Sequence, residues 1–367
     1  MRTPSFISSA IILSAFLFSA MAATAQTPTP PPYEDDSVIK VDSRLVVVPV
    51  SVVNAAGEPV QGLTANDFRV LEEGRAQVID HVRTAEAVPL DIALLFDVSA
   101  STDSMFRFQQ QTAAKFLQDV MRADDRATII TVGEKAVIRA DRQPAAAAVQ
   151  ALTNISPTKE QTAFYDSVRF AAEHLDRATP AGRRKVIVVI SDGEDTNSVG
   201  VLRAIWNAER KITAGIQGAP LRELRVKARD TAKAQEQVRV LKALQDADTV
   251  FYSINPGGSS FHLNTMSRFG QDNMQKFADD TGGTAFLPKF SPIDTPVPLD
   301  NSINSKRNAE LLDRIFLQLA SELRAQYLVQ YYSEADYPDN RFVRLSVGLN
   351  SRPDIRVRAR QGYYVQN

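Results

Sequence analysis

The sequence predicts an α/β fold in which a doubly wound parallel sheet is joined to a small all-β domain, and three observations support this. In the middle of the chain, apolar runs alternate with segments of helical periodicity, a pattern typical of a parallel sheet covered by helices on both faces. Both ends of the chain alternate apolar and polar residues, as strands of antiparallel sheets do. The length of 367 residues leaves room for both parts.

The central domain is expected over residues 88–325. Its predicted strands are 90–96, 127–132, 186–190, 250–254 and 284–287. Its predicted helices are 104–122, 164–178, one through Met274 and Phe277, and 308–323. Residues 199–248 form a long connection, and the part from 222 to 246 is rich in Lys, Arg, Glu, Gln and Ala. We expect a helical insertion on the surface there, and a role in shaping a binding surface is the alternative.

The two ends of the chain are expected to share one β-sandwich. Residues 41–86 contain a strand at 44–53, with Val46, Val48, Val50 and Val52 on one face, and shorter strands at 67–71 and 77–84. Pro49 indicates an edge position or a bulge. Residues 326–367 add alternating segments at 326–332, 342–349 and 355–359. Neither end has enough strands to bury a core alone, so we expect the two to pair.

The N-terminus is typical of a secretory signal peptide. Arg2 precedes a largely apolar run from 6 to 21, and Ala23-Thr24-Ala25 resembles a cleavage site. We expect cleavage after residue 25, with an uncleaved anchor as the alternative, and a Pro-rich linker over 26–40. The chain has no Cys and therefore no site for a thioether-linked lipid. These features predict an exported protein, periplasmic or secreted, without stable membrane insertion after cleavage.

The charge balance narrows the class of partner. Lys and Arg number 42 against 43 Asp and Glu, which gives a net charge of -1. A general nucleic-acid binder is normally basic, so we expect no nucleic-acid partner. The oligomeric state is not predicted.

Oxygen-bearing side chains follow the predicted strands where ligands bind in parallel sheets. Asp97, Ser99 and Ser101 come directly after strand 90–96, and Asp192 follows strand 186–190. Thr162 lies just before helix 164–178. An all-oxygen set favours Mg²⁺, with Mn²⁺ or Ca²⁺ as alternatives, over Zn²⁺ or Cu²⁺. Two carboxylates and three hydroxyls leave room for water or for a carboxylate from another molecule.

Each of these motifs also has an ordinary structural interpretation. Ser and Asp at strand ends are common helix caps and turn formers, and Asp192-Gly193 is a frequent turn dipeptide. The occurrence of three such motifs in order favours a metal site over capping.

The same residues resemble the metal-ion-dependent adhesion site (MIDAS) of the von Willebrand factor type A (VWA) domain family. The stretches QTAFYD at 161–166 and VVISDGED at 188–195 also resemble that family. The segments VQGLT-x-x-DF at 60–68 and RQGYY at 360–364 are similar to its bacterial exported VWFA-related subgroup. Two departures are Ala100, where the family usually has Gly, and Glu160-Gln161, where a Gly pair is frequent.

The resemblance implies a Rossmann-like VWA domain with an adhesive function. It implies that Ser99, Ser101 and Thr162 touch the metal directly, and that Asp97 and Asp192 bind it directly or through water. It also implies that an Asp or Glu of a protein partner completes the coordination. We therefore expect a metal-dependent binding module and not an enzyme.

Two alternatives remain open. Asp97 stands where haloacid dehalogenase-type phosphoester hydrolases place their nucleophile, but the position two residues later is Ser99 instead of a second Asp. A serine hydrolase would need a base, and His81, His174 and His262 lack a suitable context. The other alternative is a metal that only braces the three loops.

Overall fold

The computed structural model describes residues 43–99, 106–158, 160–210, 217–255, 265–291, 296–350 and 354–365. These all belong to a unit that spans Asp42–Asn367. The expected signal peptide and linker lie outside the described residues. Within the described part of the chain, no helix combines the length and apolar character needed to span a bilayer.

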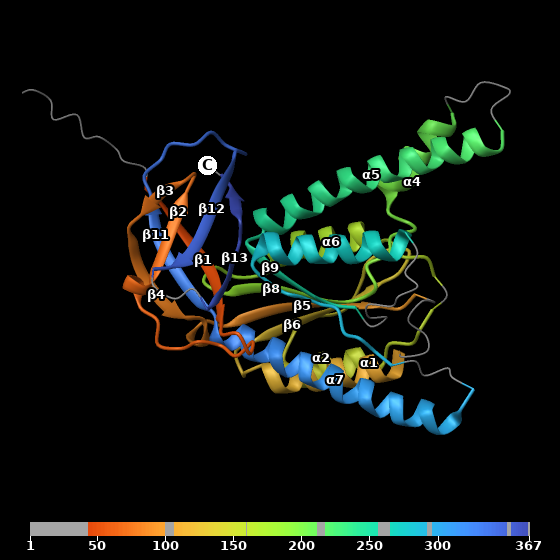
Figure 1. The fold of residues 1–367 in the computed structure, drawn as a ribbon, viewed down its shortest axis with the longest axis horizontal. Helices are drawn as coiled ribbons and strands as arrows, with labels where there is room; N and C mark the ends of the chain where they lie inside the picture. The colour runs from red at the N-terminus through yellow and green to blue at the C-terminus, as the bar shows by residue number, and fades with distance from the viewer. Residues whose placement is uncertain are drawn as a thin grey trace, which may run out of the picture. The chain divides into compact units, whose positions relative to one another are not determined.

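A six-stranded sheet forms the centre of this unit, in the order β10-β9-β8-β5-β6-β7 (Figure 1). Its strands are β5 (Leu90–Asp97), β6 (Arg126–Val132), β7 (Val137–Gln143), β8 (Arg184–Ile190), β9 (Thr249–Ile254) and β10 (Ala285–Phe286). All neighbours are parallel except β6 and β7. The predicted parallel core is therefore present, with an antiparallel edge strand that the sequence pattern did not indicate.

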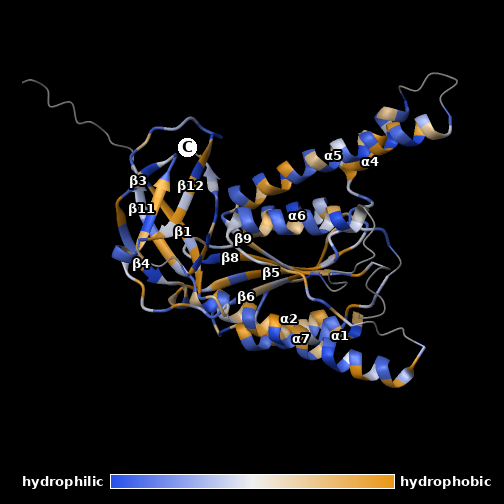
Figure 2. Cartoon of the chain, viewed as in Figure 1, coloured by the Kyte–Doolittle hydropathy of each residue, from blue (hydrophilic) through white to orange (hydrophobic). Residues whose placement is uncertain are grey.

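Helices cover both faces of this sheet, because alternate strand residues are apolar on each side. Ile92, Leu94 and Phe96 pack with one group of helices, whereas Ala93 and Leu95 pack with the other. The first group is α1 (Phe106–Val120), α2 (Ala145–Thr153) and α7 (Pro298–Ala325). The second is α3 (Phe164–Ala178), α4 (Val199–Glu209), α5 (Ala219–Asp246) and α6 (Thr265–Thr281). Figure 2 shows polar residues on the outer surfaces of these helices.

Two four-stranded antiparallel sheets combine strands from both ends of the chain. The first has the order β13-β1-β11-β4, and the second β14-β12-β2-β3. The N-terminal strands are β1 (Arg44–Val53), β2 (Phe68–Glu72), β3 (Arg75–Gln77) and β4 (Ile79–Thr84). The C-terminal strands are β11 (Tyr327–Ser333), β12 (Phe342–Leu349), β13 (Arg356–Ala359) and β14 (Gly362–Tyr364). One apolar core fills the space between the two sheets, and Val48, Val70 and Val343 are completely buried in it.

Pro49 occupies an edge position only locally and marks no bulge, because β1 itself is not an edge strand of its sheet. Strand β1 lies between β13 and β11, and Pro49 sits opposite Leu328 in a regular register. The partner β13 begins its pairing only at Val50. Proline is accommodated at this position because the pairing with β13 does not extend to it.

Buried polar contacts connect the antiparallel sheets to the α/β part. Gln326 lies between α7 and β11, where its Oε1 accepts a hydrogen bond from Arg184. Its Nε2 donates to Ser51 Oγ at 3.1 Å and to Tyr252 Oη at 2.8 Å. The Gln326 side chain thus hydrogen-bonds to residues of β1, β8 and β9. These bonds fix the position of the chain directly after the C-terminal end of α7.

Candidate metal site

The first two of the predicted loops leave the sheet side by side. Strands β5 and β8 are parallel neighbours, and Phe96 lies opposite Ile190. Asp97 ends β5, and Ser191 follows β8. The Ser191 hydroxyl donates a 2.6 Å hydrogen bond to Asp97 Oδ2, and the Ser99 amide donates a 2.9 Å bond to Asp97 Oδ1. Donors from two different loops therefore fix the Asp97 carboxyl group.

The Asp97 side chain is completely buried. Burial raises its pKa, because loss of solvent penalises the charged form, and the nearby charge of Glu194 raises it further. The hydrogen bonds from Ser191 and Ser99 act in the opposite direction. A divalent cation would stabilise a carboxylate in such a position, so the electrostatics fit a metal ligand.

The loop that carries Thr162 is attached to both of the other loops. The Thr162 amide donates to Thr196 Oγ1 at 3.0 Å, and the Thr162 carbonyl accepts from the amides of Thr196 and Asn197 at 2.9 and 3.0 Å. Further back, the Thr158 amide donates to the carbonyl of Val98 at 2.8 Å. The three ligand-bearing loops are thus hydrogen-bonded to one another at one edge of the sheet.

Reciprocal capping fixes the loop after β8 against the start of α3. Asp195 Oδ2 accepts from the Tyr165 amide at 3.2 Å, and Ser198 Oγ accepts from the Asp166 amide at 3.2 Å. In return, Asp166 Oδ2 accepts from the Val199 amide at 2.8 Å, at the first residue of α4. Each helix start is satisfied by a side chain of the other segment, so loop and helices are positioned together.

Two glycines allow the Asp192 loop to lie directly on α6. Gly193 has φ +73°, and a Cβ at this position would lie 2.7 Å from the carbonyl oxygen of Gly270. A Cβ on Gly270 would lie 2.6 Å from the carbonyl oxygen of Asp192. Asp192 is half-buried, and its Oδ1 accepts a 3.0 Å bond from the Glu194 amide. The position of this carboxylate therefore depends on a close backbone contact between the loop and α6.

Four of the five predicted ligands are described by the structure: Asp97, Ser99, Thr162 and Asp192. They stand on the three connected loops. Ser101 and Ala100 lie outside the described residues. In the part of the chain that the structure describes, no group of three or more His, Cys, Asp or Glu residues is arranged to hold a metal. An ion at this edge would therefore depend on hydroxyl oxygens beside the two carboxylates.

The residues that hold the site together were not predicted as such. Ser191 lies within the motif at 188–195, between a buried strand and Asp192, and that position was a usable signal. Glu160, one of the two departures from the family pattern, accepts a 3.3 Å bond from the Glu134 amide. A Cβ on Gly133 would lie 2.4 Å from Glu160 Oε2, so a larger residue at 133 would displace the Glu160 carboxylate. The contact of Thr158 with Val98 had no counterpart in the sequence pattern.

A shallow groove begins next to these loops. It has a volume of about 770 Å³ and runs between β7 and α2. Polar side chains dominate its lining, including Arg139, Gln143, Gln150, Asn154 and Thr158. One of these lining residues, Thr158, is hydrogen-bonded to Val98 in the loop that follows β5, whereas none of the predicted ligands that the structure describes lines the groove.

Comparisons with known proteins are consistent with this description. Residues 92–194 match the model of the von Willebrand factor type A domain. That range includes all five predicted ligands, from Asp97 to Asp192. A search of curated proteins gave no significant match.

Several solved structures are similar at low identity. An aerotolerance-related membrane protein from Bacteroides fragilis is 17% identical, with a TM-score of 0.36, and the match covers 61% of this chain and 99% of that one. A von Willebrand factor type A protein from Catenulispora acidiphila is 15% identical, with a TM-score of 0.36 and coverages of 75% and 51%. Proximal thread matrix protein 1 from the mussel byssus, with a zinc-occupied MIDAS motif, is 12% identical, with a TM-score of 0.40 and coverages of 69% and 50%.

The chain spans about half the length of the last two of these structures. The match over residues 92–194 begins in β5 and ends in the loop after β8, which are the two elements that carry Asp97 and Asp192. The chain therefore contains a von Willebrand factor type A domain over residues 92–194.

Proposed function

We propose that this chain is an exported, metal-dependent protein-binding module. In this proposal Asp97, Ser99, Ser101, Thr162 and Asp192 hold Mg²⁺, with Mn²⁺ or Ca²⁺ as alternatives. The observation that carries the proposal is the buried Asp97 carboxyl group, which is fixed by donors from two loops at the ends of β5 and β8. A carboxyl group held rigidly at a strand end, among hydroxyl-bearing loops, has the chemistry of a hard-cation ligand.

The donor set explains why the partner would be acidic. Two carboxylates neutralise a divalent cation, and the hydroxyls of Ser99, Ser101 and Thr162 add no charge. A bound ion would supply a Lewis-acidic position that accepts one further anionic oxygen. An Asp or Glu side chain of a partner protein meets that requirement, and the direct metal–oxygen bond makes such binding sensitive to chelators.

Two further parts of the proposal rest on the sequence. The N-terminal segment favours export to the periplasm or beyond the cell. The residues around the site favour binding over turnover, because Asp97 is followed two positions later by Ser99, where a phosphoester hydrolase of the dehalogenase type needs a second acid. The zinc-occupied MIDAS motif of the mussel protein illustrates divalent metal binding by that protein.

The test is capture of partners from an envelope extract on the immobilised chain, in Mg²⁺ and in EDTA. We expect specific proteins to be retained in Mg²⁺, eluted by chelator and lost with Asp97→Ala. The matched control is Ser253→Ala, because Ser253 is buried on β9 and its hydroxyl has no hydrogen-bond partner among the described residues.

The alternatives give different outcomes. Partner retention that EDTA does not change, although calorimetry shows that the chain binds Mg²⁺, would make the metal structural. Hydrolysis of p-nitrophenyl phosphate that is lost in Asp97→Asn would favour the hydrolase. Either result contradicts the proposed function.

A further inference from the structure

The hairpin formed by α4 and the first part of α5 extends past the edge of the sheet that carries the candidate metal site (Figure 1). We define this distal hairpin as residues 199–210 and 217–230. It begins directly after the loop of Asp192, because Ser198 is the N-cap of α4. A macromolecule that approaches this edge of the sheet would therefore meet the hairpin.

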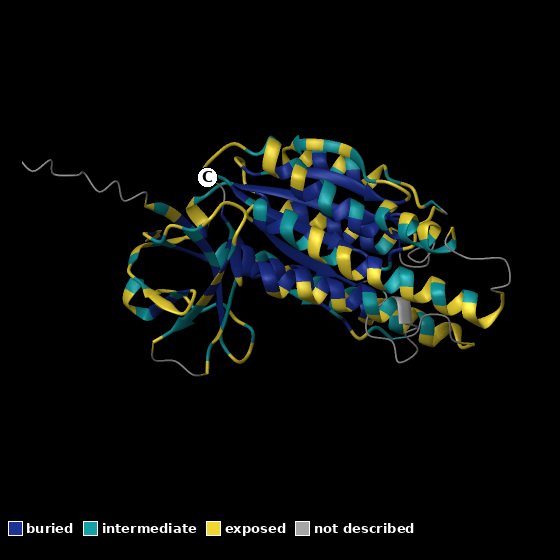
Figure 3. Cartoon of the chain, turned by 90° about the horizontal axis from the view of Figure 1, so that it is seen from above, coloured by how far each residue is buried: buried dark blue, intermediate teal, exposed yellow. Residues whose placement is uncertain are grey.

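The distal hairpin contributes little to the core. The only buried residue of α4 is Val201, and the buried residues of α5 begin at Ala232. Helices α4 and α5 pack against each other, and residues 219–230 of α5 are all exposed or half-buried, as are many helical residues at the outer surface of the molecule (Figure 3). Val201 is the only fully buried residue of this projection, and Ala204 and Ile205 pack beside it, so most of its surface does not serve the core and is open to another role.

An aromatic side chain stands exposed on this projection. Trp206 on α4 is the only tryptophan of the chain and is 66% exposed. Val226 on α5 is also exposed. Tryptophan and arginine are among the residues that are enriched in the energetic centres of protein interfaces. An exposed Trp on a two-helix projection is therefore suited to contact a partner.

The charge of the distal hairpin indicates the chemistry of that partner. Among its described residues, six are basic and three are acidic, whereas the whole chain has a net charge of -1. Arg225 Nε lies 2.6 Å from Glu209 Oε1, and Arg229 lies 2.9 Å from Asp230, so these charges are compensated within the hairpin. The charged residues outside those two pairs are Arg203, Arg210, Arg222, Lys227 and Glu223. The excess is basic and complements an acidic surface.

We propose that the distal hairpin is a second contact site for an acidic protein segment, with Trp206 as its aromatic anchor and Arg203, Arg222 and Lys227 as its charged contacts. The inference rests on the proposed function in one respect: the segment that docks on the hairpin belongs to the partner that gives a carboxylate to the metal. The metal then provides one strong, short-range bond, and the hairpin provides steering and selection among acidic partners.

The experiment uses the full chain and a fluorescein-labelled deca-glutamate peptide as the probe, with deca-glutamine as the neutral reference. In Mg²⁺ we expect the anisotropy to rise with deca-glutamate only, and this binding to weaken steeply with added salt. Because Trp206 is the only tryptophan, its emission reports on the hairpin alone, and we expect a blue shift when the peptide binds.

A pair of charge-matched variants isolates the hairpin. Reversal of its three exposed basic residues, in R203E/R222E/K227E, should lower the affinity for deca-glutamate roughly tenfold or more. The control R69E/R75E/R83E makes the same change in net charge at exposed positions of β2, β3 and β4 and should leave the affinity unchanged. Trp206→Ala should weaken binding by about tenfold, and Trp206→Phe should weaken it less.

The outcomes separate this inference from the proposed function. If Asp97→Ala abolishes peptide binding and the hairpin variants bind normally, the metal site stands and the hairpin inference is overturned. If the hairpin variants lose binding and neither EDTA nor Asp97→Ala has an effect, the hairpin inference stands and the metal-dependent function fails. The inference is overturned if the unmodified chain does not bind deca-glutamate. It is also overturned if the same basic residues bind phosphatidylglycerol vesicles instead of the peptide.

Discussion

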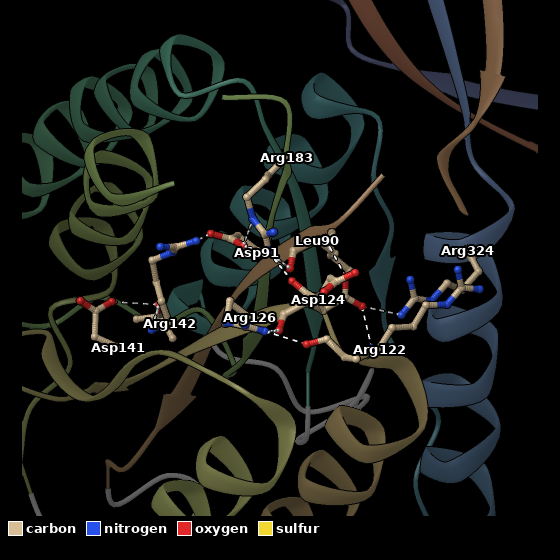
Figure 4. A network of polar contacts seen from close by, with 12 residues as sticks. Leu90, Asp91, Arg122, Asp124, Arg126, Asp141, Arg142, Arg183 and Arg324 are labelled. Atoms are coloured by element: carbon tan, nitrogen blue, oxygen red, sulfur yellow. Dashed lines mark hydrogen bonds and ion pairs between the residues drawn. The ribbon is translucent and has the colours of Figure 1, made fainter. Parts of the chain in front are cut away.

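Strand β5 carries a buried carboxyl group at each end, and the two are held in different ways. At its N-terminal end, Asp91 accepts from Arg142 Nε at 2.8 Å and from Arg183 Nε at 2.6 Å (Figure 4). At its C-terminal end, Asp97 is held by the Ser191 hydroxyl and the Ser99 amide. Guanidinium groups neutralise the first carboxylate, whereas the second is oriented by neutral donors.

The N-terminal edge of the sheet extends this internal neutralisation. Asp125 is buried and accepts from the Leu90 amide at 2.7 Å, from the Arg122 amide at 2.8 Å and from Arg324 Nη2 at 2.7 Å. Arg324 lies near the end of α7, so this network joins β5, the turn before β6 and α7. Charge on this edge is used for structure.

The two edges of the sheet differ in whether their buried carboxyl groups are already paired with cationic side chains, and this difference indicates which edge can bind a ligand. The oxygens of Asp91 already accept hydrogen bonds from two guanidinium groups, so this carboxylate would be a poor ligand for a metal cation. The hydroxyl and the amide fix the position of the Asp97 carboxyl group, and a divalent cation that binds there can displace its proton. At one end of β5, Asp91 therefore serves stability, whereas at the other end Asp97 is suited to bind a ligand. The variants described below test this difference.

The largest effect is expected at the structural end. Asp91→Ala leaves Arg183, which is mostly buried, without its carboxylate, so we expect a loss of about 3 kcal/mol in the free energy of unfolding. The control Asp176→Ala removes the partner of Lys185 from an exposed position and should cost at most about 1 kcal/mol. Urea unfolding measures both. Equal losses in the two variants would contradict the structural role of Asp91.

The next effect is expected at the ligand end. Ser191→Ala removes the donor to Asp97 Oδ2 and should lower Mg²⁺ affinity by about 10- to 100-fold, as loss of a group that orients a ligand does. Ser253→Ala, which deletes a buried hydroxyl without a partner among the described residues, should leave the affinity unchanged. Isothermal calorimetry compares the two, and an unaltered affinity in Ser191→Ala would show that the hydroxyl does not orient the ligand.

A smaller effect is expected from the backbone contact behind Asp192. Gly270→Ala places a methyl group against the carbonyl oxygen of Asp192, so the loop must move, at a cost of about 1 to 2 kcal/mol and with weaker Mg²⁺ binding. Gly348→Ala on β12 meets no atom within 4 Å and is the control. If Gly270→Ala bound Mg²⁺ like the unmodified chain, the contact would not position the ligand.

The smallest effect is a pH dependence. Because burial raises the pKa of Asp97, its carboxyl group stays protonated to a higher pH in the folded chain than in the unfolded chain. Asp97 therefore lowers the stability of the metal-free chain as pH rises from the ordinary carboxyl range through its raised pKa. In urea unfolding across that range, Asp97→Asn should lose less stability than the unmodified chain, and Mg²⁺ should reduce the difference. A difference of opposite sign would refute this electrostatic account.

The central sheet could be predicted because its strands are buried on both faces. The continuous apolar runs at 90–96, 186–190 and 250–254 correspond to β5, β8 and β9 within one or two residues. Helix α3 was predicted with its observed bounds because its apolar residues recur at regular helical spacing. Helix α7 begins ten residues earlier than the expected 308, because its first turns are exposed and lack an apolar stripe.

Strand β7 and helix α2 were not predicted, because each is only partly buried and carries a weak pattern. Residues of β7 alternate between half-buried and exposed, and α2 has only two buried residues. At the site, the ligand types could be predicted from the motif, but their supports could not. The bond from Ser191 to Asp97 joins positions 94 residues apart, and only the parallel pairing of β5 with β8 brings them together.

The most direct test of the central claim is calorimetric titration of Mg²⁺ into the unmodified chain, Asp97→Asn and Asp176→Ala. We predict that the unmodified chain and Asp176→Ala take up a single Mg²⁺ with the same affinity, and that Asp97→Asn takes up none while its circular dichroism is unchanged. Uptake by Asp97→Asn that equals that of the unmodified chain, or no uptake of Mg²⁺, Mn²⁺ or Ca²⁺ by the unmodified chain, would contradict the account.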